Sequence, residues 1–216
     1  MGRIGEITRR TKETEIWIRL NLDGRGEAKL DYPIGFLTHM LTAFARHSLF
    51  DLDIRAAGDL EVDQHHLVED TGIVLGGCLA RALGDKRGIR RVGSCIFPMD
   101  ETLARAAVDL SGRAFLVFRG ELSAVPLVSG GGFGVASFQT DTVEDFWEGF
   151  TQTAGIALHL DILRGRSDHH KIEALFKAAA RSLRDACEID PRAADSIPST
   201  KGLLETPGAL NPGLLA

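Results

Sequence analysis

The chain has 216 residues, of which 44% are hydrophobic and 25% charged, a composition typical of a globular protein with a packed core. Its formal net charge of -5 argues against a general surface for nucleic acid or anionic membranes, but it leaves room for a local basic pocket. No uncharged run approaches the roughly 18 residues of a membrane span, and residues 1–18 hold no apolar stretch of the kind found in a signal peptide, so we expect no targeting segment. We therefore expect a cytoplasmic protein.

The three cysteines are isolated from one another. Cys78, Cys95 and Cys187 have no CxxC spacing, and each lies in an apolar run. Such cysteines are more typical of buried free thiols than of metal ligands or disulfides. We predict free thiols at all three positions.

The first half of the chain predicts three strands, a helix, a strand and a second helix. Residues 14–22 alternate, with Ile16, Ile18, Leu20 and Leu22 on one face, and the DGRG sequence at 23–26 then predicts a hairpin turn. The remaining elements follow in chain order: a helix over 36–50, a short strand over 50–56, and a long helix over 65–85 whose small residues suit close packing.

The second half repeats this order of elements. Residues 12–25 match residues 100–113, so that Glu13 corresponds to Glu101 and Arg25 to Arg113. We predict strands over 90–97, 101–110, 114–122 and 156–162, and helices over 143–155 and 169–188.

The repeated order predicts an α+β fold with an internal duplication of a β-β-β-α-β-α unit, in which sheets pack against a helical layer. We expect one compact domain, made of a first half at 1–87, a second half at 88–190 and a C-terminal tail at 191–216. The glycine-rich stretch at 126–138 lacks the GK[ST] ending and the strand-to-helix context of a P-loop, so we interpret it as a mobile loop.

The sequence His-His-x-x-Glu occurs twice, at 65–69 and at 169–173. On a helix, residues i and i+4 share a face, whereas neighbours point about 100° apart. His65 and Glu69 can therefore bind one ion, and so can His169 and Glu173, but the second histidine of each pair points elsewhere. A single histidine pair of this kind often only caps the start of a helix or lies exposed there, without binding a metal. Two matched copies favour two similar metal sites, each completed from the other copy or from another subunit.

Two further ligands are suggested by the repeat. His39 and Asp145 stand 26 and 24 residues before the two histidine pairs. Either residue by itself is more typical of an ordinary helix surface. Imidazole and carboxylate ligands without thiolates suit Mn²⁺, Fe²⁺ or Zn²⁺, and Mn²⁺ is favoured where carboxylates are numerous. We expect His47 and His159 to be structural.

A second group of residues is suited to binding a phosphate. Arginine forks and lysine point charges are the usual partners of phosphate groups. Individually, each of these residues is more typical of a solvated surface: Arg91, Arg113, Lys177, Lys201 and the hydroxyl of Ser199.

Taken together, several segments identify a known family. The sequences FLTHML, DQHHLVEDTGIVLG, FPMDET, DLSGR, DHHKIEALFKAAARSLRDA and PSTKG resemble imidazoleglycerol-phosphate dehydratases over about residues 3–204. The resemblance implies a hydro-lyase that converts D-erythro-imidazoleglycerol phosphate into imidazole acetol phosphate in histidine biosynthesis. It also implies a duplicated β-β-β-α-β-α fold and 24-subunit shells built from trimers.

The resemblance also implies roles for individual residues. It makes seven residues ligands of two Mn²⁺ ions that lie between subunits: His39, His65, His66, Glu69, His169, His170 and Glu173. It places five residues around the substrate phosphate: Arg91, Arg113, Lys177, Ser199 and Lys201. Glu13 is placed beside the reacting carbons.

One ligand position departs from the family pattern. The family often has a histidine where this chain has Asp145, so either a carboxylate replaces the imidazole or that site has one protein ligand fewer. We favour replacement, because carboxylates suit Mn²⁺. From helix geometry and the repeat, we hypothesise two ligand sets: His65, Glu69, His170 and Asp145 for one ion, and His39, His66, His169 and Glu173 for the other.

The implied reaction constrains the mechanism. It removes a weakly acidic C–H proton beside the imidazole ring and expels a hydroxide, and no carbonyl takes up the charge. Two metals that hold the ring as imidazolate would make it the electron sink, through a diazafulvene-type intermediate. Glu13 is the expected acid-base group, and Asp100 and Glu101 are weaker, more distant candidates.

Two other functions use the same residues. A binuclear metal hydrolase would activate water and would not need an imidazole in its substrate. A metal-dependent structural or storage shell would use the ions only to join subunits, which leaves Glu13 and the basic residues without a role.

Overall fold

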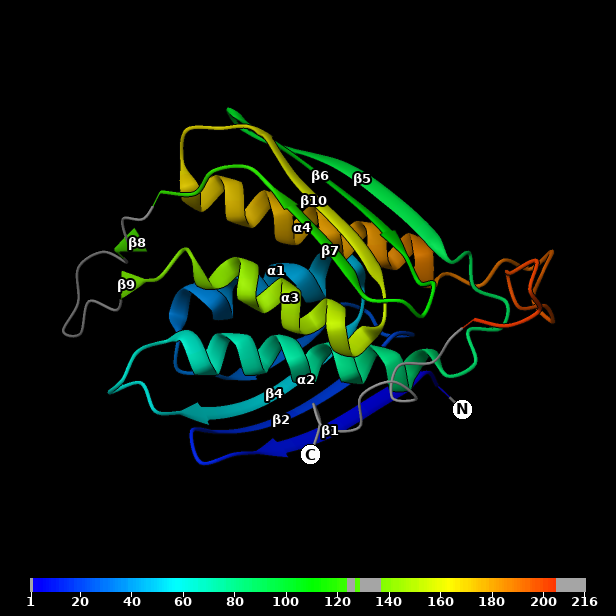
Figure 1. The fold of residues 1–216 in the computed structure, drawn as a ribbon, viewed down its shortest axis with the longest axis horizontal. Helices are drawn as coiled ribbons and strands as arrows, with labels where there is room; N and C mark the ends of the chain where they lie inside the picture. The colour runs from blue at the N-terminus through cyan, green and yellow to red at the C-terminus, as the bar shows by residue number, and fades with distance from the viewer. Residues whose placement is uncertain (1, 124–126, 129–136, 205–216) are drawn as a thin grey trace.

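The computed structural model describes residues 2–123, 127–128 and 137–204. Figure 1 shows two β-sheets that enclose a layer of helices, with the helices packed side by side between them. Each sheet has four strands, and a separate two-stranded ribbon lies at one edge of the molecule. The predicted α+β fold, with sheets on a helical layer, is therefore confirmed.

The elements follow the predicted order in both halves. The first half contains β1 (Ile4–Arg10), β2 (Thr14–Asn21), β3 (Ala28–Asp31), α1 (Gly35–Ser48), β4 (Asp51–Gly58) and α2 (His65–Leu83). The second half contains β5 (Val92–Met99), β6 (Thr102–Asp109), β7 (Phe115–Arg119), β8 (Leu127–Val128), β9 (Ser137–Phe138), α3 (Thr142–Ala154), β10 (Ala157–Arg164) and α4 (Asp168–Cys187). The short β8–β9 ribbon is the one addition to the repeated unit among the described residues.

The two sheets share one topology. Their strand orders are β1-β2-β4-β3 and β5-β6-β10-β7, and in each the last strand pairs in parallel while the other pairs are antiparallel. Equivalent positions also make equivalent contacts: the Cys78 thiol donates to the Ile18 carbonyl, and the Ser182 hydroxyl donates to the Ala106 carbonyl. The internal duplication is visible in the fold, whereas the limits 1–87, 88–190 and 191–216 stay predictions.

The predicted hairpin at 23–26 is wrong. β2 does not pair with β3; β4 lies between them, and β3 pairs with β4 in parallel. The connecting loop is held by Asp51 at the start of β4, whose carboxylate accepts the backbone N–H groups of Arg25 at 2.8 Å and Glu27 at 3.0 Å. A Gly-rich turn signal is local and does not specify which strand the chain joins next.

The core lies between the sheets and is filled from both halves. The predicted alternation in β2 is confirmed, because Ile16 and Ile18 are fully buried. An aromatic cluster joins the helices: the Trp147 ring on α3 lies 4.8 Å from the Phe176 ring on α4 and 6.4 Å from the Phe44 ring on α1. These contacts tie the two halves into a single core.

Two glycines allow α2 and α3 to approach closely. A Cβ atom at Gly72 would collide with the carbonyl oxygen of Phe146, and one at Gly76 would collide with that of Phe150. Nearby, the Thr153 hydroxyl on α3 donates to the Ile73 carbonyl of α2 at 2.7 Å. The small residues of this helix therefore serve close packing, as expected.

The cysteines are free in the structure. Cys78 and Cys187 are buried, and burial raises the pKa of each thiol to about 12, which keeps both unreactive. Cys95 is only half-buried; it lies on β5, which is an edge strand of its sheet. The glycine-rich stretch predicted as a mobile loop falls mostly outside the described residues. None of the described helices is long and apolar enough to cross a membrane.

The glycine contacts lead to a stability prediction. We expect Gly76→Ala to lower the free energy of unfolding by about 1–3 kcal/mol, because the added methyl group must separate two helix backbones. The matched control is Gly35→Ala, in the first turn of α1, where an added Cβ meets no atom within 4 Å. That change should be neutral or slightly stabilising. Urea unfolding followed by circular dichroism measures both, and equal effects would contradict the packing role of Gly76.

Candidate functional site

Three of the predicted metal ligands converge where α1 packs against α4. His39 lies on α1, and His169 and Glu173 lie one turn apart at the start of α4. The Glu173 Oε2 atom lies 3.4 Å from His39 Nε2 and 3.2 Å from His169 Nε2. Within the described part of the chain, this is the one group of three or more His, Cys, Asp or Glu side chains whose ligand atoms all lie within 4.8 Å of one another.

The donor atoms of this cluster fit a divalent metal ion. Neighbouring ligands bound at about 2.1 Å are separated by roughly 3 Å, close to the spacings here. Burial tends to raise the pKa of Glu173, but Lys177 and His39 outweigh burial and the net pKa lies below its usual value. The carboxylate is therefore ionised at neutral pH, and two imidazoles with one carboxylate suit Mn²⁺, Fe²⁺ or Zn²⁺.

A second, looser cluster forms where α2 packs against α3. His65 Nδ1 lies 3.4 Å from Asp145 Oδ2, and His65 Nε2 lies 3.8 Å from Glu69 Oε2. The imidazole ring therefore stands between the two carboxylates, and the three side chains do not meet at one point. Asp145 thus lies beside the first copy's histidine, in the position that the repeat assigns to the counterpart of His39.

The second histidine of each pair turns away from these clusters. His66 Nδ1 lies 3.1 Å from Asp59 Oδ2, and His170 Nδ1 lies 2.8 Å from Glu101 Oε2. Within one chain, neither ring joins the ligand set that the sequence hypothesis gives it. The sequence offered no signal for Asp59, which follows β4 in a loop, although Glu101 was a weak candidate.

Glu13 occupies the exposed turn between β1 and β2. Its side chain has no hydrogen bond or ion pair with any other described residue, and its backbone carbonyl accepts the N–H of Asp59 at 3.0 Å. Glu13 and Asp59 line the same open hollow, with a volume of about 360 Å³. The carboxylate is therefore free to act on a bound molecule. Asp100, at the matching turn of the second half, is also exposed.

A buried polar group anchors the Glu13 turn to α2. The Thr14 hydroxyl donates to Asp70 Oδ2 at 2.5 Å, and Arg9 Nη1 lies 2.5 Å from the same oxygen. Asp70 directly follows Glu69, so one helix turn carries both a predicted ligand and this anchor. Sequence reasoning missed Arg9 and Asp70; the available signal was a carboxylate on the apolar face of a helix.

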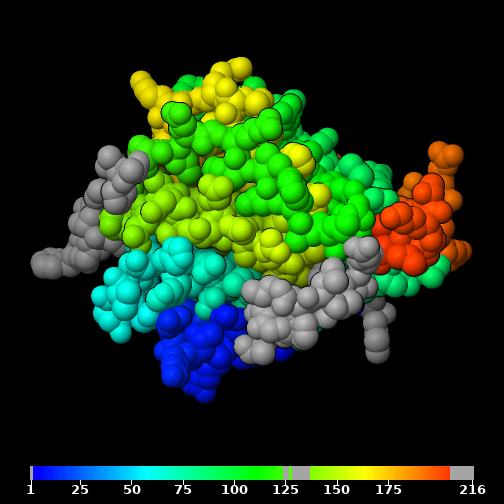
Figure 2. Space-filling model, in the orientation of Figure 1, coloured from blue at the N-terminus to red at the C-terminus, as the bar shows by residue number. Residues whose placement is uncertain are grey.

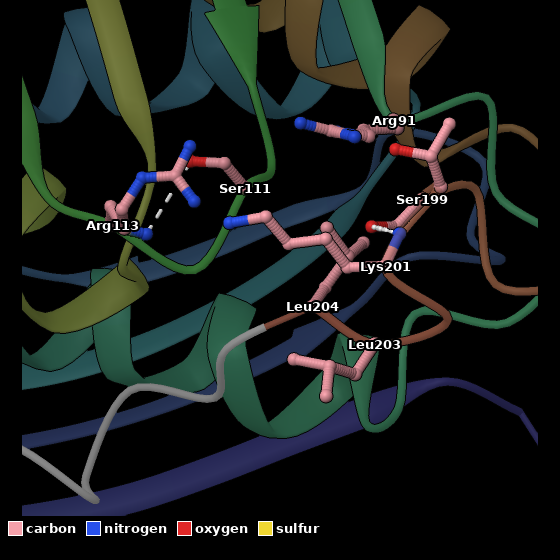
Figure 3. Close-up of a pocket in the computed structure, with 8 residues that line it drawn as sticks. Arg91, Ser111, Arg113, Ser199, Lys201, Leu203 and Leu204 are labelled. Carbon is pink, nitrogen blue, oxygen red and sulfur yellow. Dashed lines mark hydrogen bonds between the residues drawn. The ribbon is translucent and has the colours of Figure 1, made fainter.

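Four of the five predicted phosphate-binding residues line one pocket (Figure 3). Arg91, Arg113, Ser199 and Lys201 surround a cavity of about 150 Å³, together with Ser111, Thr200, Leu203 and Leu204. The Lys201 ammonium group extends toward the Arg113 side of the pocket (Figure 3). Ser111 and Thr200 were not predicted, although both lie inside the quoted sequences DLSGR and PSTKG.

Arg91 links this pocket to the tail. Its guanidinium group makes two bonds to Asp109, at 2.7 and 3.0 Å, and donates to the Pro198 carbonyl at 2.9 Å. The carboxylate of Asp109 raises the pKa of Arg91. Arg91 therefore orders the segment that presents Ser199 and Lys201, and it retains unused donors for an anion.

Lys177 is not part of this pocket. Its ammonium group lies 2.7 Å from Glu173 Oε1, in the middle of α4, and 5.5 Å from the centre of the Phe97 ring. Helical spacing correctly placed Lys177 on the face of His169 and Glu173 but carried no information about Arg113 or Lys201.

The two remaining histidines lie outside both clusters. His47 packs edge-on against Phe97 at 5.3 Å, and burial lowers the pKa of its imidazole. His159 is exposed on the outer face of the second sheet.

The histidine clusters and the basic pocket lie at opposite ends of the chain's helical layer. His169 stands at the start of the 20-residue helix α4, whereas the backbone of Arg91 bonds to Ala186 at its end. At 1.5 Å per residue, these positions are separated by roughly 26 Å. Figure 2 shows the tail residues near 200 at the opposite end from the segment near residue 60. One small molecule cannot reach both groups within a single chain.

Comparisons with known proteins agree on one family. Residues 33–183 match the family model described as imidazoleglycerol-phosphate dehydratase. A relative of that name from Jannaschia sp. is 50% identical over 202 residues, covering 94% of this chain and 100% of the relative. Another, from Acinetobacter baylyi, is 51% identical over 202 residues, covering 94% and 96%.

Solved structures carry the same name. The crystal structure of imidazoleglycerol-phosphate dehydratase from Staphylococcus aureus is 38% identical, with a TM-score of 0.74, and the match covers 87% of this chain and 99% of that one. The enzyme from Pyrococcus furiosus is 32% identical, with a TM-score of 0.72 and coverage of 92% and 100%. The sequence resemblance is thus confirmed over almost the whole chain, which belongs to the imidazoleglycerol-phosphate dehydratase family.

Proposed function

We propose that this protein is a hydro-lyase that removes water from D-erythro-imidazoleglycerol phosphate to give imidazole acetol phosphate, a step of histidine biosynthesis. Its full-length similarity to imidazoleglycerol-phosphate dehydratases carries the proposal. The chain offers groups for both ends of such a substrate: imidazole and carboxylate donors at one end of the helices, and a basic pocket at the other.

The proposed cofactor is a pair of Mn²⁺ ions. His39, His169 and Glu173 would hold one ion, and His65, Glu69 and Asp145 would hold the other. His66 and His170 would complete the sets, His66 on the first ion and His170 on the second. Bound Mn²⁺ would act as a Lewis acid that holds the substrate's imidazole ring as imidazolate and makes that ring an electron sink. The donor chemistry and the spacing of the first cluster support this assignment.

The complete site is proposed to lie between subunits of a 24-subunit assembly. Two observations support self-association. The basic pocket and the histidine clusters are too far apart in one chain for a single small substrate, so another copy must supply one of them. In addition, the second sheet exposes large apolar side chains on both edge strands, Val92 and Ile96 on β5 and Phe115 on β7, each at about 60% exposure. Such side chains are suited to burial in an interface.

Within this site, different residues of the chain would transfer the proton, bind the phosphate and keep a metal ligand ionised. Glu13 would move the proton at the reacting carbons, because its carboxylate is exposed and unpaired among the described residues. Arg113, Lys201 and Ser199 would hold the phosphate, and this remote binding energy would orient the reacting carbons. Lys177 would keep Glu173 ionised.

Metal removal tests the proposed function as a whole. A chelator should abolish turnover, and added Mn²⁺ should restore both imidazole acetol phosphate production and the proposed 24-subunit particle. Product formation and particle size are measured on the same sample. Recovery of particle size without turnover would favour a structural shell, and hydrolysis of phosphate esters that lack an imidazole would favour a metal hydrolase. Either result would contradict the dehydratase proposal.

Replacing the proposed acid-base group tests the mechanism. Glu13→Gln should retain metal content and particle size but lose about 10²–10⁴-fold in kcat, because the amide cannot transfer the proton. Glu15→Gln is the matched control, since Glu15 is a nearby exposed carboxylate that pairs with Arg10 at 2.7 Å. Near-normal turnover of Glu13→Gln would remove Glu13 from the mechanism.

Neutralising the basic pocket tests phosphate binding. Arg113→Met keeps an unbranched stem of similar length but removes the charge, and should lower kcat/KM about 10–100-fold, the value of one or two charge-assisted hydrogen bonds. Bound Mn²⁺ should be unchanged, because the pocket lies far from the histidines. Arg90→Met, which removes only an exposed ion pair with Glu188, serves as the control. Unchanged kcat/KM in Arg113→Met would exclude Arg113 from the phosphate site.

A further inference from the structure

Glu13 and Glu101 occupy the same position of the repeat but have different surroundings. Each follows the first strand of its half, Glu13 after β1 and Glu101 after β5. Glu101 is fully engaged: Oε1 accepts the backbone N–H groups of Arg166 at 3.2 Å and Ser167 at 2.9 Å, and Oε2 lies 2.8 Å from His170 Nδ1. Glu13 makes no such contact with the described residues. The two glutamates therefore perform different tasks.

In the first half, Asp59 occupies the place beside the second histidine. Both of its oxygens lie 3.1–3.2 Å from His66 Nδ1, and its backbone N–H donates to the Glu13 carbonyl. The corresponding segment of the second half, after β10, is Gly165-Arg166-Ser167 and offers no carboxylate. Each half thus supplies one carboxylate to its second histidine, but from a different loop.

These contacts determine which ring nitrogen is protonated. An ionised carboxylate only accepts hydrogen bonds, so Nδ1 must donate in both rings. A carboxylate side chain is ordinarily ionised at neutral pH. In a neutral imidazole with a protonated Nδ1, the Nε2 atom keeps its lone pair. That atom alone is then available as a metal ligand.

We propose that Glu101 and Asp59 are positioning residues, each of which fixes the ring orientation and tautomer of one histidine so that its Nε2 binds metal. Glu101 serves His170, and Asp59 serves His66. This division leaves Glu13, the repeat counterpart of Glu101, as the one of the two glutamates that is free for proton transfer. The inference deepens the proposed function and rests on the two-ion site described above.

Among the proposed histidine ligands, His66 and His170 are the two whose ring orientation depends most on a carboxylate partner. Both rings point away from the ligand clusters of their own chain, and each side chain is about one-third exposed. An exposed ring without a partner would sample several orientations and both tautomers before binding. A carboxylate bonded to Nδ1 restricts the ring to one orientation and one tautomer before metal binds, and it raises the basicity of Nε2. Loss of such partners typically weakens metal binding about 10–100-fold.

The test compares alanine and amide variants in the full-length protein. Mn²⁺ binding is titrated by the electron paramagnetic resonance signal of free Mn²⁺. Glu101→Ala and Asp59→Ala should each weaken one of the two binding sites about 10–100-fold. Glu101→Gln and Asp59→Asn also lose the negative charge, but their amide oxygens can still accept from Nδ1. They should therefore bind Mn²⁺ within a few-fold of the unchanged protein.

The amide variants separate hydrogen bonding from simple charge attraction. If Glu101→Gln binds as weakly as Glu101→Ala, the tautomer role is wrong. If Glu101→Ala binds two ions as tightly as the unchanged protein, positioning by Glu101 is excluded. Glu188→Ala, at the far end of α4, removes a surface carboxylate paired with Arg90 and should leave both affinities unchanged. Thermal unfolding of each variant checks that the start of α4 remains folded.

Turnover separates the two glutamates. At saturating Mn²⁺, Glu101→Ala should recover most of its activity, whereas Glu13→Gln should remain inactive despite normal Mn²⁺ affinity. Failure of Glu101→Ala to recover with two ions bound would overturn its assignment as a positioning residue. If the unchanged protein does not bind two Mn²⁺ ions or does not dehydrate the substrate, the proposed function itself fails, which is a distinct result.

Discussion

Adjacent residues on a helix point about 100° apart, and the arrangement of the candidate site follows from that constraint. In both histidine pairs, the two rings are 6.0–6.1 Å apart and nearly perpendicular. The first ring of each pair joins a glutamate one turn later, and the second ring faces a carboxylate from another loop. The two rings of one short motif therefore face in different directions, which suits a site shared between different parts of an assembly.

The two halves share one topology but differ in the side chains that they carry. The strand orders agree, and Gly5 and Gly93 bring β1 and β5 equally close to the backbones of α2 and α4. The differences are concentrated at the candidate site. His39 is replaced by Asp145, and the free Glu13 is replaced by the engaged Glu101. A shared topology with different side chains thus places two unlike sets of residues at equivalent positions.

The length of the helices sets the distance between the histidine clusters and the basic pocket. α2 and α4 run across the molecule (Figure 1). The histidine pairs lie at their first turns, and the basic pocket lies near the end of α4. The rise of about 1.5 Å per residue fixes this separation along α4. Rigid helices thus hold the two ends apart, and in the proposed assembly a neighbouring copy would bring them together.

The order of elements, the repeated histidine motif and the family can all be recognised in the amino-acid sequence. Alternation in β2 and the helical spacing of α1, α2 and α4 are local patterns, and each is set by residues close together in the chain. The motif could be recognised because its residues are also close together in the chain: His65 and Glu69, like His169 and Glu173, lie one helix turn apart. Correspondence between repeats also pointed to His39 and Asp145.

Which of these residues lie in contact depends on the folded chain. It placed β3 beyond β4, brought Asp59 and Glu101 to the second histidines, and paired Lys177 with Glu173 rather than with the basic pocket. It also anchored the Glu13 turn through Arg9 and Asp70. These contacts join residues that are distant in the chain, and their positions depend on how sheets and helices pack. Local periodicity carries no information about such packing, so sequence reasoning pointed to the proposed ligands but not to the carboxylates that contact the second histidines.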